Sequence, residues 1–263
     1  MTTVRFAHVS DIHFGGENVA AVAACRDWIA DQAPDLVLIT GDLTREGLQA
    51  EFQAARAWVD SLSAPVLVVP GNHDTPYFDL AKRLFAPWRR YERYFGPVPE
   101  EADQLDGLAI ARINTARGVQ LRANWSKGAI SARQAGAAVR ALAAAPEGAL
   151  RVAACHHPLI EMVGAPMSGK VHGGRAAAAV FARGGVDLVL TGHVHAPFVL
   201  PFSGGDGRTW AVGAGTLSVR ERGVPAGFNC IEAEADGVTC TALTWTGSRF
   251  EPWRTWRLDR RVG

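Results

Sequence analysis

The sequence predicts an α/β fold with two packed sheets, on three observations. Short apolar runs alternate with helical segments along the first three quarters of the chain. These runs are mostly β-branched, as expected for strands covered on both faces. From Thr209 onward the pattern changes to alternating strand-like runs and glycine turns, which fits a second sheet packed against the first. With 263 residues and no evident linker or repeat, we expect a single domain, residues 1–263.

Six apolar runs are predicted strands: Val4–Val9, Leu36–Thr40, Val66–Pro70, Leu108–Asn114, Val152–Cys155 and Val186–Thr191. Four helices are predicted between them from apolar residues at helical spacing, a capping box and a terminal glycine pair. They are Asn18–Gln32, Glu46–Leu62, a helix opening at Ser131 with Gln134 as its capping partner, and Arg175–Arg183.

All four cysteines are predicted to be free thiols. Two of them are isolated along the chain, and the other two lie in a predicted hairpin, Asn229–Thr244. A two-residue turn at Asp236–Gly237 would set Ala233 opposite Cys240. Cys230 then points to the other face of the hairpin, so the two thiols cannot pair. Free buried thiols are the expected state in a reducing compartment.

Composition and charge limit the cellular location and the classes of partner that we expect for this chain. The chain is 48% hydrophobic and 20% charged, with a formal net charge of +1. This balance gives no electrostatic reason to expect a nucleic acid or a membrane as a partner. A small anionic substrate is still compatible, because a metal site supplies its own positive charge. No apolar stretch reaches the roughly 20 residues that span a bilayer. The first residues also lack the apolar core of a signal peptide, so we expect a cytoplasmic protein.

Five segments place Asp, Asn and His directly after predicted strands, where α/β proteins build their sites. They are Asp11-Ile12-His13, Gly41-Asp42, Gly71-Asn72-His73-Asp74, His156-His157-Pro158 and Gly192-His193-Val194-His195. In extended chain, residues i and i+2 point the same way, so Asp11 with His13, and His193 with His195, are each expected to aim two ligands at one place. Preceding glycines permit tight turns off the strands. Mixed carboxylate, amide and imidazole ligands suit Mn, Fe or Zn, so the segments predict a shared metal site.

Taken in order, these segments resemble the signature of the calcineurin-like metallophosphoesterase superfamily: D-x-H, G-D, G-N-H-D, H and G-H-x-H. The text Gly-Asp-Leu-Thr and Gly-Asn-His-Asp is most similar to the bacterial class III cyclic-nucleotide phosphodiesterase branch. The resemblance implies a four-layer αββα sandwich of two mixed β-sheets flanked by helices. It also implies a dinuclear metal-dependent phosphoric ester hydrolase.

The resemblance further implies which residues hold two divalent or trivalent ions (Mn, Fe or Zn). Asp42 would bridge the two ions. The first set would be completed by Asp11, His13 and His195, and the second by Asn72, His156 and His193. His156 is preferred because it directly ends a predicted strand, and its neighbour His157 is the alternative.

We therefore expect a phosphodiesterase that hydrolyses a small phosphodiester by metal-activated hydroxide attack on phosphorus, with a 3′,5′-cyclic nucleotide as the favoured substrate. His73 is not assigned to a metal, so it is expected to contact the phosphate or to protonate the leaving oxygen. Asp74 is expected to orient the imidazole of His73.

Other members of the superfamily are the alternatives. Protein phosphatases carry G-D-x-x-D-R-G and G-N-H-E where this chain has Gly-Asp-Leu-Thr-Arg-Glu-Gly and Gly-Asn-His-Asp. Lipid A precursor hydrolases carry Arg where His73 stands. The near-neutral charge disfavours a nuclease. A non-catalytic partner-binding scaffold would have lost ligands, and none of the expected ligands is missing.

Four further features lie outside the signature. His8 is expected to be structural or to support the metal ligands, and His172 to be a plain loop residue, with a substrate contact as the alternative. The aromatic and Arg-rich segment Phe78–Gly96 is interpreted as a helix with an apolar stripe and a solvated basic face; the alternative is a cap over the active site that helps hold a phosphate. The Trp-rich tail from Trp245 to Trp256 is expected to cover the sandwich or a dimer partner.

Overall fold

The computed structural model describes residues 3–121, 124–160, 171–203 and 205–261. Within these ranges the chain forms two six-stranded sheets. From edge to edge, the first sheet contains β12 (Phe250–Asp259), β11 (Gly237–Trp245), β10 (Gly227–Ala233), β1 (Val4–Val9), β2 (Leu36–Ile39) and β3 (Val66–Val68). The second contains β4 (Asp103–Leu105), β5 (Leu108–Ile113), β6 (Leu150–Cys155), β7 (Leu188–Thr191), β9 (Trp210–Gly213) and β8 (Phe198–Pro201).

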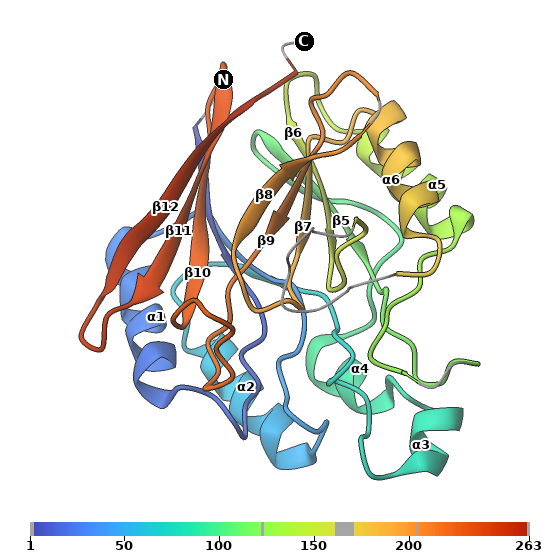
Figure 1. Ribbon diagram of the computed structural model, residues 1–263, viewed down its shortest axis with the longest axis vertical. Coiled ribbons are helices and arrows are strands. Elements are labelled where there is room, and N and C mark those ends of the chain that lie inside the picture. The colour runs from blue at the N-terminus through green and yellow to red at the C-terminus, as the bar shows by residue number, and fades with distance from the viewer. Residues whose placement is uncertain (1–2, 122–123, 161–170, 204, 262–263) are drawn as a thin grey trace.

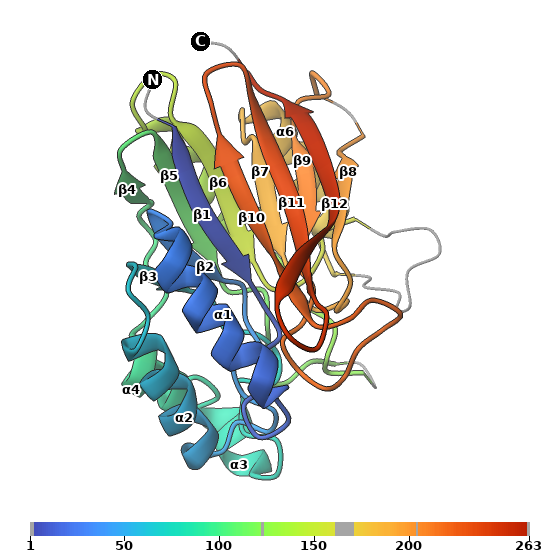
Figure 2. The same ribbon diagram turned by 90° about the vertical axis from the view of Figure 1, so that its left-hand side faces the viewer.

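Helices cover the outer face of each sheet, which confirms the predicted four-layer αββα sandwich of mixed sheets (Figures 1 and 2). The helices are α1 (Val19–Gln32), α2 (Gln49–Asp60), α3 (Leu80–Phe85), α4 (Arg89–Phe95), α5 (Ala132–Ala143) and α6 (Gly174–Arg183). The first sheet carries α1 and α2, and the second carries α5 and α6. Among the described residues, no helix is both long enough and apolar enough to cross a membrane.

Three buried apolar clusters fill the three interfaces between the layers. Successive side chains of β1 point to opposite faces of the sheet, so this one strand contributes to two of the clusters. Phe6 lies in the cluster between the sheets, together with Leu38 of β2 and Leu190 of β7. Ala7 and Val9 lie in the cluster beneath α1 and α2. The buried strands therefore have apolar side chains on both faces, as their sequence predicts.

The prediction that the last quarter of the chain forms the second sheet is wrong. Strand β9 joins the second sheet beside β7, whereas β10, β11 and β12 extend the first sheet from the free edge of β1. Figure 2 shows β1 and β10 side by side and running in opposite directions. Period-2 alternation identifies strands but does not specify which sheet edge they join.

The hairpin of β10 and β11 is present, but its register differs from the prediction by two residues. Ala233 pairs with Val238, and Cys240 pairs with Ile231. The amide of Glu234 donates to the carbonyl of Gly237 at 2.9 Å, so the turn lies one residue earlier than predicted. A two-residue shift preserves the faces, and Cys230 and Cys240 remain on opposite sides of the hairpin. All four cysteines are free, as predicted.

The Arg-rich segment forms two short helices, α3 and α4, in place of one. In α4 the buried Tyr91 donates to the carbonyl of Val68 at 3.2 Å, and Tyr94 stacks on Phe52 of α2. This half matches the interpretation as a helix packed by its apolar stripe. The α3 half does not match that interpretation, because its residues Leu80 and Arg83 line a pocket beside His73.

The Trp-rich tail covers the sandwich. Trp245 packs against the cluster under α1, and Trp256 packs against the cluster between the sheets. Trp253 remains 46% exposed.

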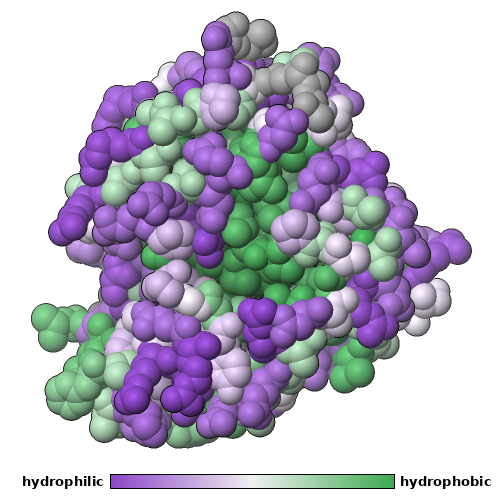
Figure 3. All heavy atoms as spheres, turned by 180° about the vertical axis from the view of Figure 1, so that it is seen from behind, coloured by the Kyte–Doolittle hydropathy of each residue, from purple (hydrophilic) through white to green (hydrophobic). Residues whose placement is uncertain are grey.

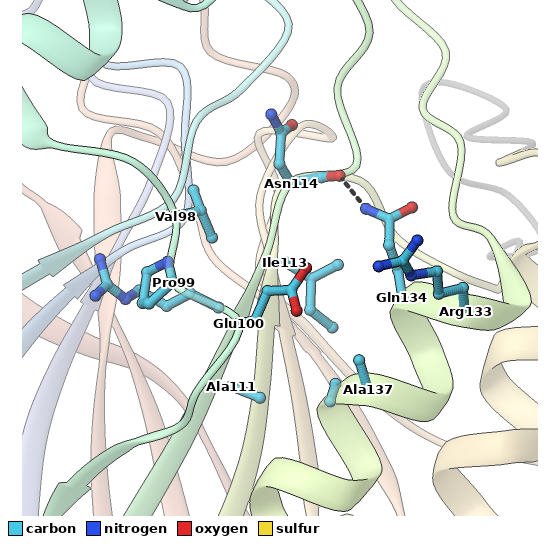
Figure 4. Close-up of a pocket in the computed structure, with 11 residues that line it drawn as sticks. Val98, Pro99, Glu100, Ala111, Ile113, Asn114, Arg133, Gln134 and Ala137 are labelled. Atoms are coloured by element: carbon cyan, nitrogen blue, oxygen red, sulfur yellow. Dashed lines mark hydrogen bonds between the residues drawn. The ribbon is translucent and has the colours of Figure 1, made fainter.

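Figure 3 views the molecule from the side opposite to Figure 1 and shows an apolar hollow with hydrophilic surroundings. A pocket of about 210 Å³ lies between β5, α5 and the segment 98–100 (Figure 4). Ala111, Ile113 and Ala137 provide apolar walls, and Gln134 donates to the carbonyl of Asn114 at 2.8 Å. None of the predicted metal ligands lines this pocket.

Candidate metal centre

The predicted site residues follow the carboxyl ends of parallel strands in both sheets. In the first sheet β1, β2 and β3 are mutually parallel, and in the second β6 and β7 are parallel. The segments that follow these strands are Asp11 and His13 after β1, Asp42 after β2, Asn72 and His73 after β3, His156 after β6, and His193 and His195 after β7. The carboxyl ends of parallel strands meet at one edge of a sheet, so the two sheets bring their polar loops together.

The backbone at five of these residues is left-handed. The φ angles are 53° at Asp11, 54° at His13, 50° at Asp42, 70° at His193 and 59° at His195. Among the described non-glycine residues, only Ala33 shares a positive φ. Such a conformation costs roughly 1–2 kcal/mol for each residue with a side chain, so it persists only where the surroundings enforce it. The prediction of extended chain at Asp11 and His13, and at His193 and His195, is therefore wrong, because each of these four residues has a left-handed φ.

Glycines let these loops approach one another closely. A Cβ on Gly71 would overlap the carboxylate of Asp42, and a Cβ on Gly192 would overlap that of Asp11. Gly41 has a φ of +96°, which favours glycine for conformational reasons. The predicted role of glycine in turning the chain therefore applies at Gly41, whereas at Gly71 and Gly192 glycine makes room for a carboxylate.

Two buried carboxylates lie at the centre of the cluster. Asp11 Oδ1 lies 3.1 Å from His195 Nε2, and Asp42 Oδ2 lies 3.2 Å from His156 Nε2. His13 Nε2 connects the two halves, at 3.2 Å from His195 Nε2 and 3.8 Å from Asp42 Oδ2. One ligand atom from each of Asp11, His13 and His195 falls within a 4.8 Å group, and so does one from each of Asp11, Asp42 and His156.

Backbone groups hold these side chains in place. The amide of His193 donates to Asp11 Oδ2 at 2.8 Å, which joins a loop of the second sheet to a loop of the first. Nδ1 of His156 contacts the carbonyl of Thr40 at 2.8 Å, and Nδ1 of His195 contacts the carbonyl of Arg220 at 2.8 Å. A carbonyl oxygen only accepts, so both rings carry their proton on Nδ1 and direct Nε2 into the cluster.

Four buried atoms of the cluster make no hydrogen bond of normal geometry with the described residues, although Asp11 Oδ1 lies near His195 Nε2 and His156 Nε2 lies near Asp42 Oδ2. The four atoms are Asp11 Oδ1, His13 Nδ1, Asn72 Oδ1 and His156 Nε2. Buried polar atoms are nearly always paired, so an unpaired set in one place points to a missing partner. Carboxylate, amide and imidazole donors are the ligands of Mn, Fe and Zn. The donor set therefore fits metal ions.

Burial and mutual charge control the protonation of the cluster. Burial alone would raise the pKa of Asp42, but the nearby His156, His73 and His13 hold it well below its usual range. Burial opposes protonation of His156, yet the Asp42 carboxylate raises the pKa of this ring to about 9. Burial lowers the pKa of His13 and of His193 to about 3. His13 and His193 are thus neutral imidazoles, the form that binds metals.

Asp74 does not orient His73, contrary to the prediction. Its Oδ2 accepts from the amide of Gly71 at 2.8 Å, and its Oδ1 accepts from the amide and the hydroxyl of Thr44, both at 2.9 Å. Asp74 thereby fastens the loop after β3 to the loop after β2. Nδ1 of His73 donates instead to the carbonyl of Arg45 at 2.6 Å. The fully buried Asp74 is therefore a structural brace for the cluster.

The adjacent histidines have different surroundings. His156 directs Nε2 into the cluster, 3.2 Å from Asp42 Oδ2. Both ring nitrogens of His157 are engaged, Nδ1 with the hydroxyl of Thr115 at 2.9 Å and Nε2 with the carbonyl of Ser126 at 2.8 Å. His157 does lie within ligand distance of His156 and His193. Its existing partners favour His156 as the ligand.

The histidines outside the signature have the roles expected for them. His8 is fully buried, with its ring nitrogens at hydrogen-bond distance from Thr40 Oγ1 (3.0 Å) and Asn229 Nδ2 (3.2 Å). His172 is an exposed loop residue whose backbone bridges Ala129. Most of the loop before it, residues 161–170, lies outside the described residues.

A pocket of about 510 Å³ opens beside the cluster. Its walls include the predicted ligand Asn72, together with His73, Tyr77, Arg83, Trp125 and Arg220. Sequence patterns gave no signal for Trp125 or Arg220, because they lie in irregular loops outside the signature. A molecule in this pocket would contact both Asn72 and His73.

A sequence profile described as Calcineurin-like phosphoesterase matches residues 4–197. The chain belongs to the calcineurin-like phosphoesterase family, a family of metal-dependent hydrolases of phosphoric esters.

Two relatives of the chain carry names that agree with this family. The chain is 26% identical over 261 residues to a probable cyclic nucleotide phosphodiesterase of Synechococcus sp., with 92% of each chain covered. It is 34% identical over 79 residues to the glycerophosphodiester phosphodiesterase GpdQ of Enterobacter lignolyticus, covering 26% of this chain and 28% of that relative.

Solved structures share the fold at low sequence identity. The purple acid phosphatase PPD1 of yellow lupin superimposes with a TM-score of 0.67 at 12% identity, covering 98% of this chain and 54% of the plant chain. Our chain thus spans about half of that phosphatase. Vacuolar Protein Sorting 29 of Cryptosporidium parvum superimposes with a TM-score of 0.53 at 12% identity, covering 99% and 100% of the two chains.

Replacing Gly71 with alanine tests the close approach of the Gly71 backbone to the carboxylate of Asp42. We expect Gly71→Ala to lower the free energy of unfolding of the metal-free protein by about 1–3 kcal/mol, since the new methyl group displaces Asp42. Urea denaturation measures the change. Gly136→Ala in α5 is the control, because its Cβ would meet only the flexible end of Arg140 at 3.3 Å. Unchanged stability of Gly71→Ala would contradict the described geometry.

Proposed function

We propose that this protein is a phosphodiesterase that uses two metal ions, drawn from Mn, Fe and Zn, to hydrolyse a small phosphodiester. The observation that carries the proposal is the convergence of buried Asp, Asn and His donors, several of them unpaired, beside an open pocket. Asp42 is proposed to bridge the ions. The first set is completed by Asp11, His13 and His195, and the second by Asn72, His156 and His193.

Paired ions of this kind supply Lewis-acid stabilisation to phosphoryl oxygens and make water nucleophilic near neutral pH. The residues of this chain position that chemistry. Asn72 and His73 line the pocket, so a phosphate placed against Asn72 also lies beside the His73 ring. The Arg45 carbonyl fixes Nδ1 of His73, and this leaves Nε2 as the nitrogen that can deliver a proton to the leaving oxygen.

The proposal favours a diester, with a 3′,5′-cyclic nucleotide as the preferred substrate. The printed names of the Synechococcus and Enterobacter relatives both specify phosphodiesterases, one for cyclic nucleotides and one for glycerophosphodiesters. The pocket of about 510 Å³ offers room for the second substituent that a diester carries. A phosphomonoesterase remains the alternative within the same family.

The dinuclear proposal predicts two metal equivalents per chain after reconstitution with Mn, measured by elemental analysis. Asp42→Asn should lose metal at both positions, because it weakens the only shared carboxylate. Asp31→Asn, which changes an exposed carboxylate of α1, is the matched control and should keep both ions. Less than one equivalent in the reconstituted wild-type protein would contradict a dinuclear centre.

The diesterase proposal predicts a larger kcat/KM for bis(p-nitrophenyl) phosphate than for p-nitrophenyl phosphate. A diester carries one fewer negative charge than a monoester dianion, and its second group can occupy the pocket beside Asn72. Steady-state assays on the Mn-loaded protein measure the ratio, and hydrolysis of cyclic AMP tests the favoured substrate. A clear preference for the monoester would favour a phosphatase.

Replacing His73 tests its role as the proton donor. We expect His73→Ala to keep both ions and to lose about 10²–10⁴-fold in rate on cyclic AMP, because a ribose oxygen leaves poorly without a proton. The loss should be much smaller on bis(p-nitrophenyl) phosphate, whose leaving group needs no proton. His172→Ala is the control, since its ring is exposed on a loop. Equal losses on the two substrates would indicate that His73 only binds the phosphate.

A further inference from the structure

We infer that the pocket beside the metal cluster binds the aromatic base of a nucleotide ester, with Trp125 as the stacking surface, and so selects nucleotides over glycerol-based diesters. The inference rests on the proposed function for the position of the phosphate. It goes further by assigning recognition to a loop outside the family signature.

The pocket and the cluster share a wall. Asn72, a proposed metal ligand, and His73, whose ring lies beside His13 and Asp42, both line the pocket. On another side, the Arg220 side chain lines the pocket while its carbonyl holds Nδ1 of His195 at 2.8 Å. A ligand whose phosphate lies at the cluster therefore extends its remaining substituent into this space.

Trp125 is half-buried and is held in place by a neighbouring cation that also lines the pocket. The guanidinium carbon of Arg83 lies over its ring, 5.5 Å from the centroid. Arg83 is itself only 6% exposed, and its Nε donates to the carbonyl of Gly118 at 2.8 Å. A cation over an indole ring is attractive and restricts its motion. Trp125 thus presents a restrained aromatic surface to the pocket.

His157 anchors the loop that carries Trp125. Its Nε2 donates to the carbonyl of Ser126 at 2.8 Å, and the loop then packs so closely that a Cβ on Gly128 would overlap the imidazole. His157 follows the predicted ligand His156 in sequence, so the Trp125 loop is fixed directly to the wall of the metal centre. We assign His157 as a positioning residue for this loop.

A second aromatic ring lines the same pocket. Tyr77 is 52% exposed, and its ring is nearly parallel to that of His73, with an interplanar angle of 7° and centroids 6.4 Å apart. Two aromatic side chains in one pocket suit a flat, π-rich ligand, because every nucleobase offers a face for stacking. A glycerol substituent has no such face.

The charge of the pocket matches an anionic nucleotide. Arg83 and Arg220 both line it, and none of the described residues along its walls is acidic. The volume of about 510 Å³ lies within the range of small-molecule sites, roughly 300–1,000 Å³. A nucleotide therefore fits the pocket in size, charge and aromatic character.

Calorimetric binding to the Mn-loaded protein tests the inference without any reaction. The probes are AMP and ribose 5-phosphate, which share a phosphate and a ribose but differ in the base. We expect AMP to bind about 5- to 100-fold more tightly, the contribution of one base–aromatic stack. Trp125→Leu should remove this preference, while Trp125→Phe should keep most of it. Trp253→Leu on β12 is the matched control for loss of an exposed indole.

The outcomes separate this inference from the proposed function. Equal affinity of the two probes for the wild-type protein, or an AMP preference that survives in Trp125→Leu, would overturn the assignment of the pocket. Thermal unfolding establishes that each variant is folded. A retained, Trp125-dependent preference for AMP in a protein that cleaves no diester would support the pocket and would contradict the phosphodiesterase proposal.

Discussion

Two carboxylates, Asp11 and Asp42, are buried and charged where the two sheets meet, and the loops around them are arranged to stabilise that charge. Burying an isolated carboxylate is costly unless it is paired and hydrogen-bonded. Asp11 accepts from the amide of His193, and Asp42 accepts from the amide of His73, each at 2.8 Å. Each amide comes from a different strand-end loop. The charges therefore also hold the loops together, and the strained backbone and the close glycines follow from that arrangement.

The residues that converge in the candidate centre could be predicted from the sequence, but their geometry could not. Ordered Asp, Asn and His segments after apolar runs identify the ends of parallel strands, and the structure brings those ends together. Extended chain is not the reason why Asp11 and His13 converge, because the backbone at both residues is left-handed. Asp74 also follows the signature, yet it serves the backbone of Gly71 and Thr44. A motif specifies which residue types are present, whereas hydrogen-bond partners depend on loops that are distant in sequence.

The positions of strands along the chain were predicted more reliably than the order in which the strands pair in the sheets. The first strand was predicted with its observed bounds, Val4–Val9, but the strands after Thr209 were placed in the wrong sheet. Gly237 was expected in a turn, whereas it pairs with Asp259 inside the sheet. Local periodicity does not contain this long-range information.

The fold also appears in a phosphatase and in a vacuolar sorting protein, so the chemistry depends on the side chains that line the site and not on the sandwich itself.

The pairing of β1 with β10 has a consequence for synthesis of the chain. Val4 pairs with Ala233, which is far along the chain, so one edge of the first strand meets its partner only late in synthesis. Until then β1 can pair with β2 alone, and its other edge presents unpaired amides and carbonyls to neighbouring nascent chains. Folding dominated by such distant pairings is slow, and its intermediates are prone to aggregate. The strand that precedes Asp11 is thus open to incorrect pairing before the C-terminal strands are synthesised.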